Sequence, residues 1–217
     1  MRALLNSSRA TWFFAIALLA GLGIGGFAIG RLMLPHSTPL GERMGEMTCL
    51  QLVFTGERAT SLILSFSTEA QAAILRLLIP GDLTFAWSYG LILFGLLGLL
   101  VLRLNGIWRR IGVYAMWFPL VASLLDSIED LFLFKIVSLV IDDSATSLPG
   151  ILPLAASTAA TLKYVFLCVL TPVFAVGGVI QGLRSDRSIG ALVVYALLIY
   201  AVGSIVLRPL QQIPACV

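Results

Sequence analysis

The chain has 217 residues, of which 59% are hydrophobic and 12% are charged, and its mean hydropathy is +1.01. Soluble domains are about half apolar and about a quarter charged, so this composition excludes an ordinary soluble domain and indicates an integral membrane protein. The formal net charge is +3, but the basic residues stand singly or in pairs rather than in a stripe, which argues against a nucleic-acid partner.

Five apolar segments are long enough to cross the hydrocarbon core of a bilayer, about 30 Å thick, as helices. The first segment follows two arginines, as a signal peptide does. Its apolar run is longer than that of a typical signal peptide and no clear small-residue cleavage site closes it, so we expect an uncleaved anchor. We therefore predict an all-α fold, a single bundle of five transmembrane helices over residues 1–217. The predicted spans cover about residues 11–33, 83–102, 111–134, 160–182 and 188–207.

The segment between the first two spans, residues 45–80, is amphipathic and is predicted to form two short helices. Thr55 is expected to cap the first of them. Thr68, with Gln71 three residues later, has the spacing of a capping box and is expected to begin the second. Pro80 and the glycine after it should end that helix before the second span. We expect both helices to lie on the outer membrane surface or to cover the bundle.

The distribution of charge predicts the orientation of the chain. Basic residues fall on one side of the alternating spans, at Arg2, Arg9, Arg103, Arg109, Arg110, Arg184 and Arg187. The acidic residues of the loops, apart from Asp186, fall on the other side, at Glu42, Glu46, Glu57, Glu69, Asp142 and Asp143. Because Lys and Arg are retained in the cytoplasm, we predict a protein of the cell inner (plasma) membrane with a cytoplasmic N-terminus and a C-terminus outside.

The stretch ASLLDSIEDLFLF, residues 122–134, places Asp126, Glu129 and Asp130 inside an otherwise apolar segment. At helical pitch Asp126 lies about 60° from Glu129 and about 40° from Asp130, so the three carboxylates share one face. An ionised carboxylate that faces lipid is costly. We therefore expect this face to point into the bundle or into a wet cavity.

Two other predicted spans carry ionisable groups at a similar depth. Counted from the cytoplasmic arginines, Asp126 lies roughly 24 Å and Lys163 roughly 31 Å into the membrane, and Asp82 lies near the height of Lys163. Tyr89 shares a helical face with Asp82. We predict a ligand-binding polar pocket near the outer face, formed by Asp82, Asp126, Glu129 and Lys163 with Tyr89 beside it. Asp82 could instead be a helix N-cap, and Tyr89 could belong to an interfacial aromatic belt.

The motifs of this region resemble those of a group of small uncharacterised bacterial multi-pass membrane proteins. The resemblance covers about residues 45–170 and consists of LQLVFTGERATSLI, D-x-x-F-x-x-x-Y from Asp82, D-x-x-E-D from Asp126, and Lys163. In that group the third-span motif usually reads D-x-x-E-N, so Asp130 departs from the pattern, which leaves the first two acids of the motif as the better candidates. The resemblance implies that the polar positions belong to one site.

Simpler interpretations of the acidic residues stay open at this point. The third span could end near residue 128, which would leave Glu129 and Asp130 in the headgroup layer. Asp126 could pair with Lys163 only to fix the register of two helices. The lysine could also extend to the membrane interface without any partner.

Small residues and cysteines predict further contacts. Gly21-x-x-x-Gly25 and Gly26-x-x-x-Gly30 in the first span indicate close helix packing within the bundle rather than dimerisation. Cys49 and Cys216 both fall on the predicted outer side, which permits a disulfide. His36 is the only histidine, so we predict no metal site and no cofactor.

The sequence contains no G-x-S-x-G, P-loop, H-E-x-x-H or dinucleotide fingerprint, and three functions stay open. The first is binding or transport of a small or lipid-like ligand, with the carboxylates engaging a cationic or hydroxylated group. The second is a membrane-embedded enzyme that modifies a lipid, in which a carboxylate with a raised pKa shuttles a proton. The third is an accessory subunit with purely structural charge pairs. The expected partners are membrane lipid and such a ligand.

Overall fold

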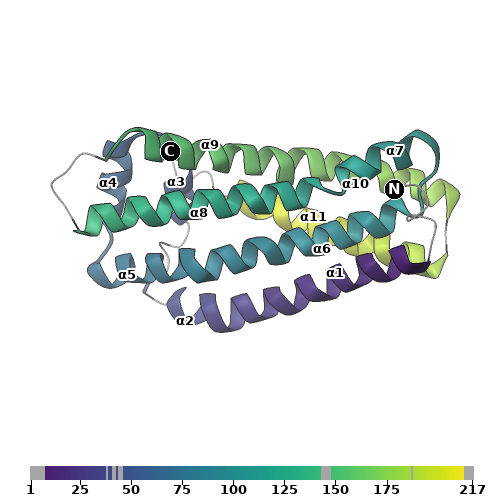
Figure 1. Ribbon diagram of the computed structural model, residues 1–217, viewed down its shortest axis with the longest axis horizontal. Coiled ribbons are helices and arrows are strands. Elements are labelled where there is room, and N and C mark those ends of the chain that lie inside the picture. Colours follow the sequence, from purple (N-terminus) through teal and green to yellow (C-terminus); the bar gives the residue numbers. More distant parts are fainter. Residues whose placement is uncertain are drawn as a thin grey trace. The chain divides into compact units, whose positions relative to one another are not determined.

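The computed structural model describes residues 8–37, 39–40, 43, 46–142, 148–186 and 188–212, and the regular structure within them is helical (Figure 1). The predicted all-α fold is therefore confirmed. The helices, with π-helical segments labelled η, are α1 (Ser8–Phe27), η2 (Ala28–Met33), α2 (Leu34–Ser37), α3 (Glu46–Gln51), α4 (Gly56–Leu64), α5 (Thr68–Arg76), η4 (Leu77–Asp82), α6 (Leu83–Val101), α7 (Gly106–Ala115), α8 (Phe118–Asp142), α9 (Ile151–Tyr164), η5 (Val165–Leu170), α10 (Thr171–Ser185) and α11 (Ile189–Gln212).

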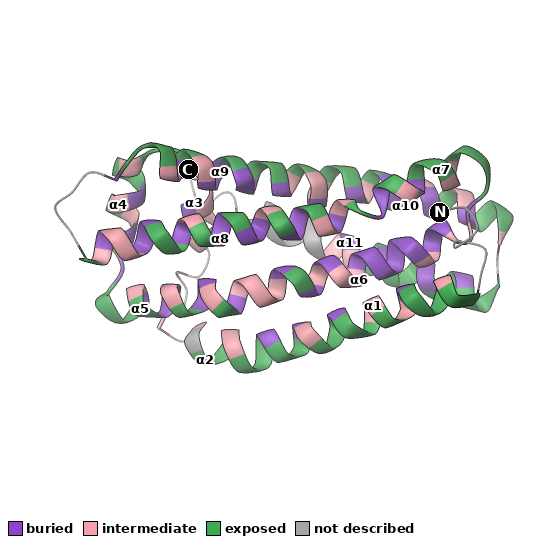
Figure 2. Cartoon of the chain, in the orientation of Figure 1, coloured by how far each residue is buried: buried purple, intermediate pink, exposed green. Residues whose placement is uncertain are grey.

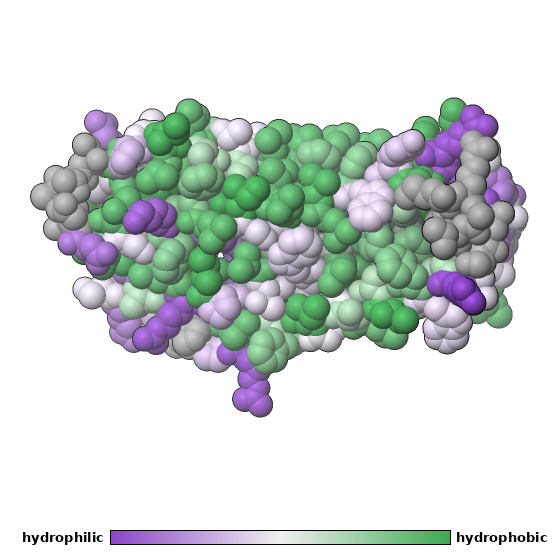
Figure 3. Space-filling model, in the orientation of Figure 1, coloured by the Kyte–Doolittle hydropathy of each residue, from purple (hydrophilic) through white to green (hydrophobic). Residues whose placement is uncertain are grey.

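Three helical runs among the described residues are long and apolar enough to cross a membrane: Ser8–Met33, Thr68–Val101 and Ile151–Ser185. Ile189–Ser204 is apolar but shorter. Hydrophobic side chains cover much of the face drawn in Figure 3, and α1 is exposed along much of its length in Figure 2. The structure thus contains three candidate spans of the five that the sequence predicts.

The predicted third span is divided in the structure. α7 ends at Ala115 with Met116 as its C-cap, and α8 begins at Phe118. From there α8 runs without interruption to Asp142, a length of 25 residues. The helix does not end near residue 128, and Glu129 and Asp130 lie in the middle of α8.

The amphipathic segment contains three helices rather than two, because the chain leaves the helix between α3 and α4. Thr55 holds the N-cap position of α4, as predicted, but its side chain makes no capping hydrogen bond. The capping residue of α5 is Ser67, whose Oγ accepts a hydrogen bond from the Ala70 backbone N–H at 3.2 Å. The predicted capping box at Thr68 is therefore wrong by one residue, since Thr68 is already helical.

A kink separates the amphipathic segment from α6. Ile79 has non-helical backbone angles, φ −132° and ψ 113°, directly before Pro80. The predicted break at Pro80 and Gly81 is confirmed within one residue. Helical geometry resumes before Asp82, so Asp82 lies inside a helical run and is not the N-cap of α6.

The chain divides into two compact units. The first consists of Met1–Gly23, Trp87–Ser123 and Tyr164–Arg208, and the second of Ile24–Ala86, Leu124–Lys163 and Pro209–Val217. Several long helices contribute residues to both units.

Close approach of α1 and α6 characterises the first unit. A Cβ atom on Gly95 would lie 2.7 Å from the Phe14 backbone oxygen, and a Cβ on Gly21 would lie 2.8 Å from the Ile92 backbone nitrogen. The predicted packing role of Gly21 is confirmed by this contact. Gly26, in contrast, faces open space. Around this contact the core is apolar and includes Phe14, Leu93, Leu97, Leu100, Phe174 and Leu198.

The second unit has its own apolar core, which includes residues of α3, α4, α5, η4, α8 and α9. Its fully buried members include Ile63, Ile74, Leu78, Leu133 and Ile136. Cys49 of α3 is disulfide-bonded and Cys168 is not in a disulfide, whereas Cys216 lies outside the described residues.

Candidate functional site

Lys163 forms ion pairs with two carboxylates of α8. Its Nζ lies 2.6 Å from Asp126 Oδ1 and 2.6 Å from Glu129 Oε2. The side chains are 6%, 7% and 0% exposed, so both ion pairs are shielded from solvent. The alternative in which Lys163 extends to the membrane interface without a partner is wrong.

Local sequence explains how these side chains come to face one another. Asp126 and Glu129 are three residues apart on α8 and therefore lie on the same side of the helix. On α9 the buried face consists largely of small residues, among them Ala156 and Ala160, and Lys163 continues this face one turn further. Small side chains permit close approach of a neighbouring helix, so the amine can reach the carboxylates without leaving the buried face.

Asp130 is buried in the same part of α8 as Asp126 and Glu129. It is 0% exposed, and neither of its carboxyl oxygens has a hydrogen-bond partner among the described residues. The same holds for Oε1 of Glu129 and for Oγ of Ser157, a buried residue of α9. The second oxygen of Glu129 lies at ion-pair distance from Lys163 but not in hydrogen-bonding geometry.

Asp82 adds a fourth carboxyl group to this region. It is half-buried at the end of η4 and is close enough to Asp126, Asp130 and Lys163 for direct electrostatic interaction. We call Asp82, Asp126, Glu129, Asp130 and Lys163 the carboxylate–lysine cluster. With one ammonium for four carboxyl groups, full ionisation would leave an excess of three negative charges.

Two irregular helical segments adjoin the cluster in sequence. The segment η4, which contains the kink at Ile79, ends at Asp82, and the π-helical segment η5 begins two residues after Lys163. π-helical turns inside α-helices occur frequently at functional sites. The position of η5 next to Lys163 is consistent with a functional region.

The predicted site residues do not all belong to the same unit. The structure brings Asp126, Glu129 and Lys163 into contact and places Asp82 within electrostatic range of them. Tyr89 belongs to the first unit, where it packs half-buried against the apolar core.

Asp130 and Ser157, whose side-chain oxygens have no hydrogen-bond partner among the described residues, are not among the predicted ligand-binding residues. Asp130 departs from the motif of the resembling group, although its helical spacing from Asp126 places it on the same face. Ser157 had no such signal, because a serine in a small-residue stretch is common in packed helices. Among the described residues no group of three or more His, Cys, Asp or Glu side chains is arranged to hold a metal ion.

Comparison of the chain with protein-family models, with curated proteins and with solved structures finds no match. The fold and the site define the class on their own: a helical bundle with candidate membrane spans and buried ion pairs of Asp126 and Glu129 with Lys163.

Proposed function

We propose that the chain is a five-span protein of the inner membrane that binds a small or lipid-like ligand at the carboxylate–lysine cluster, near the outer face. The recognised group of the ligand is cationic, and it takes the place of a proton on the cluster. The N-terminus lies in the cytoplasm and the C-terminus outside, in keeping with the distribution of arginines along the sequence.

The five spans of this proposal include α8 and α11 besides the three apolar runs. α8 has 25 residues and α11 has 24, and helices of this length extend over about 36 Å, enough to cross the hydrocarbon core. α8 is less apolar than the other runs because it carries the acids of the cluster. Membrane helices accept such residues where they face the bundle interior and serve a function.

The observation that carries the proposal is the unpartnered carboxyl group of Asp130 beside a single lysine. An isolated ionised carboxylate in an apolar interior is so costly that the group takes up a proton or a counter-ion instead. Lys163 already engages Asp126 and Glu129, so it does not balance Asp130 and Asp82 as well. Protons, or the positive group of a ligand, therefore supply the remaining charge.

Infrared spectroscopy of the full chain in lipid nanodiscs tests the proposal, because a protonated carboxyl group has a carbonyl stretch separate from that of a carboxylate. At neutral pH we expect this band in the wild type, and we expect Asp130→Asn to reduce it. Addition of an alkylammonium probe should release protons from the wild type and not from Asp130→Asn. Asp142→Asn is the matched control, because Asp142 is an exposed carboxylate at the end of the same helix.

Two results would contradict the proposal. A wild-type spectrum without a protonated carboxyl band would show that the carboxyl groups of the cluster are all ionised and that protons do not supply the remaining charge. Equal proton release from the wild type and from Asp130→Asn would show that the probe acts elsewhere.

A structural accessory subunit is the second candidate, favoured by the double ion pair of Lys163. Asp126→Asn distinguishes the two, because it removes one ion-pair partner and leaves Asp130 in place. Loss of folded protein in detergent would favour the structural role. A folded variant with unchanged alkylammonium binding would favour a ligand site at Asp130.

A further inference from the structure

A concave pocket lies in the amphipathic segment of the second unit. The pocket has a volume of about 430 Å³ and is lined by Glu46, Cys49, Leu52, Val53, Arg58, Ser61, Leu62 and Ser65. Small-molecule sites typically have volumes of about 300–1,000 Å³. None of the lining residues belongs to the carboxylate–lysine cluster, so this pocket is a separate site.

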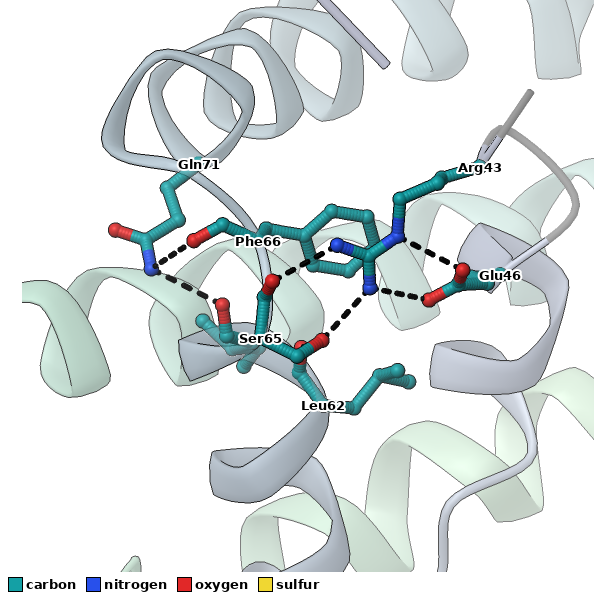
Figure 4. Close-up of polar contacts among 7 residues, drawn as sticks. Arg43, Glu46, Leu62, Ser65, Phe66 and Gln71 are labelled. Carbon is teal, nitrogen blue, oxygen red and sulfur yellow. Dashed lines mark hydrogen bonds and ion pairs between the residues drawn. The ribbon is translucent and has the colours of Figure 1, made fainter. Parts of the chain in front are cut away.

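The acidic side chain of the pocket is already engaged. Figure 4 shows the guanidinium of Arg43 against Glu46, with Nε 2.8 Å from Oε1 and Nη2 2.6 Å from Oε2. Arg43 also donates to the Ser65 backbone oxygen at 2.8 Å and stacks over the ring of Phe66 at 4.1 Å. The hydrogen bond from Arg43 lowers the pKa of Glu46 below its usual value. Glu46 therefore stays ionised and paired, and this ion pair adds no net charge to the pocket.

Arg58 is the remaining charge in the lining. Its side chain is exposed in the first turn of α4, and no hydrogen bond or ion pair joins it to another described residue. Ser61 follows three residues later on the same face of α4 and is also exposed. Glu57, the acid in this turn, is not part of the lining. Because Arg43, which is outside the lining, balances Glu46, the positive charge of Arg58 is left uncompensated, with the Ser61 hydroxyl beside it.

The lining also has an apolar part. Leu52, Val53 and Leu62 contribute hydrocarbon surface to it, whereas the Ser65 backbone oxygen is engaged by Arg43. A ligand that matches both the polar side of the pocket, at Arg58 and Ser61, and its apolar side combines an anionic, hydrogen-bond-accepting head with an apolar portion. Arginine binds phosphate oxygens through parallel N–H donors, which makes a phosphate ester a good match for this head.

We propose that this pocket binds a phosphate ester attached to a hydrocarbon portion, as in the headgroup region of an anionic phospholipid. Arg58 is the counter-ion of the phosphate, Ser61 donates a hydrogen bond to it, and the leucines and Val53 contact the first carbons of the apolar portion. The proposal does not depend on the function of the carboxylate–lysine cluster.

Native mass spectrometry of the full chain in detergent micelles measures this binding, with dihexanoylphosphatidic acid as the probe and inorganic phosphate as the second arm. The wild type should bind the lipid and bind inorganic phosphate much more weakly. Arg58→Gln should lower the lipid affinity by about tenfold or more, as expected for the loss of a charge-assisted contact. Ser61→Ala, which keeps the charge, should lower it by a smaller factor.

Arg76→Gln is the matched control, because Arg76 is an exposed arginine of the same unit, in the last turn of α5, and does not line the pocket. Its lipid affinity should equal that of the wild type. Equal losses in Arg58→Gln and Arg76→Gln would show that surface charge in general attracts the lipid and would overturn the proposal. So would tight binding of inorganic phosphate alone, or unchanged lipid affinity in both Arg58→Gln and Ser61→Ala.

Discussion

Ion pairs of nearly equal length occur in the two units, in very different surroundings. In the first unit Arg103 Nη1 lies 2.7 Å from Asp186 Oδ2, and the two side chains are 29% and 33% exposed. In the second unit Lys163 Nζ lies 2.6 Å from Glu129 Oε2, with side chains 6% and 0% exposed. Water solvates the first pair in the folded and the unfolded chain alike, so its formation changes the free energy of unfolding little. The second pair has lost its water and depends on its partners.

The difference extends to the whole buried interior of each unit. Every buried charged residue among those described belongs to the second unit: Asp126, Glu129, Asp130 and Lys163. The buried polar residues of the first unit are neutral hydroxyls, Ser88, Ser123 and Thr171. The interior of the first unit is thus stabilised by apolar packing, whereas the interior of the second unit contains charged side chains that have lost their hydration. Such a cost is expected where the charges have a function.

Removal of the buried ammonium should have the largest effect on stability. Lys163→Met leaves Asp126 and Glu129 without a cation, and we expect the free energy of unfolding to fall by about 3–5 kcal/mol. Denaturant unfolding of the full chain in detergent micelles measures it. Lys135→Met is the control, because Lys135 is exposed on α8, and its effect should stay within about 0.5 kcal/mol. If the two variants were equally stable, the buried ammonium of the second unit would contribute no more to stability than an exposed one.

Addition of one methyl group tests the packing of the first unit. Gly95→Ala places a Cβ 2.7 Å from the Phe14 backbone oxygen and 2.8 Å from the Leu18 backbone nitrogen. Backbone atoms cannot rotate aside, so we expect a loss of about 1–3 kcal/mol in the same unfolding experiment. Gly26→Ala is the control, because its Cβ would meet nothing within 4 Å. A Gly95→Ala variant as stable as Gly26→Ala would show that α1 and α6 are not so close.

The exposed ion pair should show the smallest effect, which is present at neutral pH and is lost in acid. The Ser188 backbone N–H, which donates to Asp186 Oδ1 at 2.9 Å, together with the Ser188 hydroxyl and Arg103, holds the pKa of Asp186 below its ordinary value of 3.8. A lowered pKa stabilises the folded chain above the ordinary value. This stabilisation is lost as the pH falls below 3.8 through the pKa of the folded state.

Asp186→Asn should therefore lower the thermal unfolding midpoint slightly at neutral pH and narrow its difference from the wild type in acid. Thermal unfolding of both proteins between about pH 7 and about pH 3 measures this difference. A difference in unfolding midpoint that widens in acid would contradict the lowered pKa of Asp186. If Asp186→Asn lowered the free energy of unfolding at neutral pH as much as Lys163→Met does, solvent exposure would not explain the difference between the two ion pairs.

Much of the fold follows from local patterns in the sequence. The apolar runs predict the helices because helical length and hydrocarbon thickness match. The break at Pro80 follows from the ring of proline, which cannot continue a helix. The errors concern boundaries, such as the cap at Ser67 instead of Thr68 and the interruption at Met116. Such boundaries depend on which of several similar side chains reaches a free backbone group, and a pattern does not decide it.

The sequence by itself determined that the chain is helical and apolar enough for a membrane, and that Asp126, Glu129 and Asp130 share a helical face. These properties depend on composition and on the pitch of a single helix. Only the tertiary structure decided that Lys163, 37 positions after Asp126 along the chain, pairs with Asp126 and Glu129, while the Asp130 carboxyl oxygens have no hydrogen-bond partner among the described residues. The choice of partner depends on how two separate helices rotate and pack against each other. That arrangement results from many side chains at once, and no local spacing encodes it.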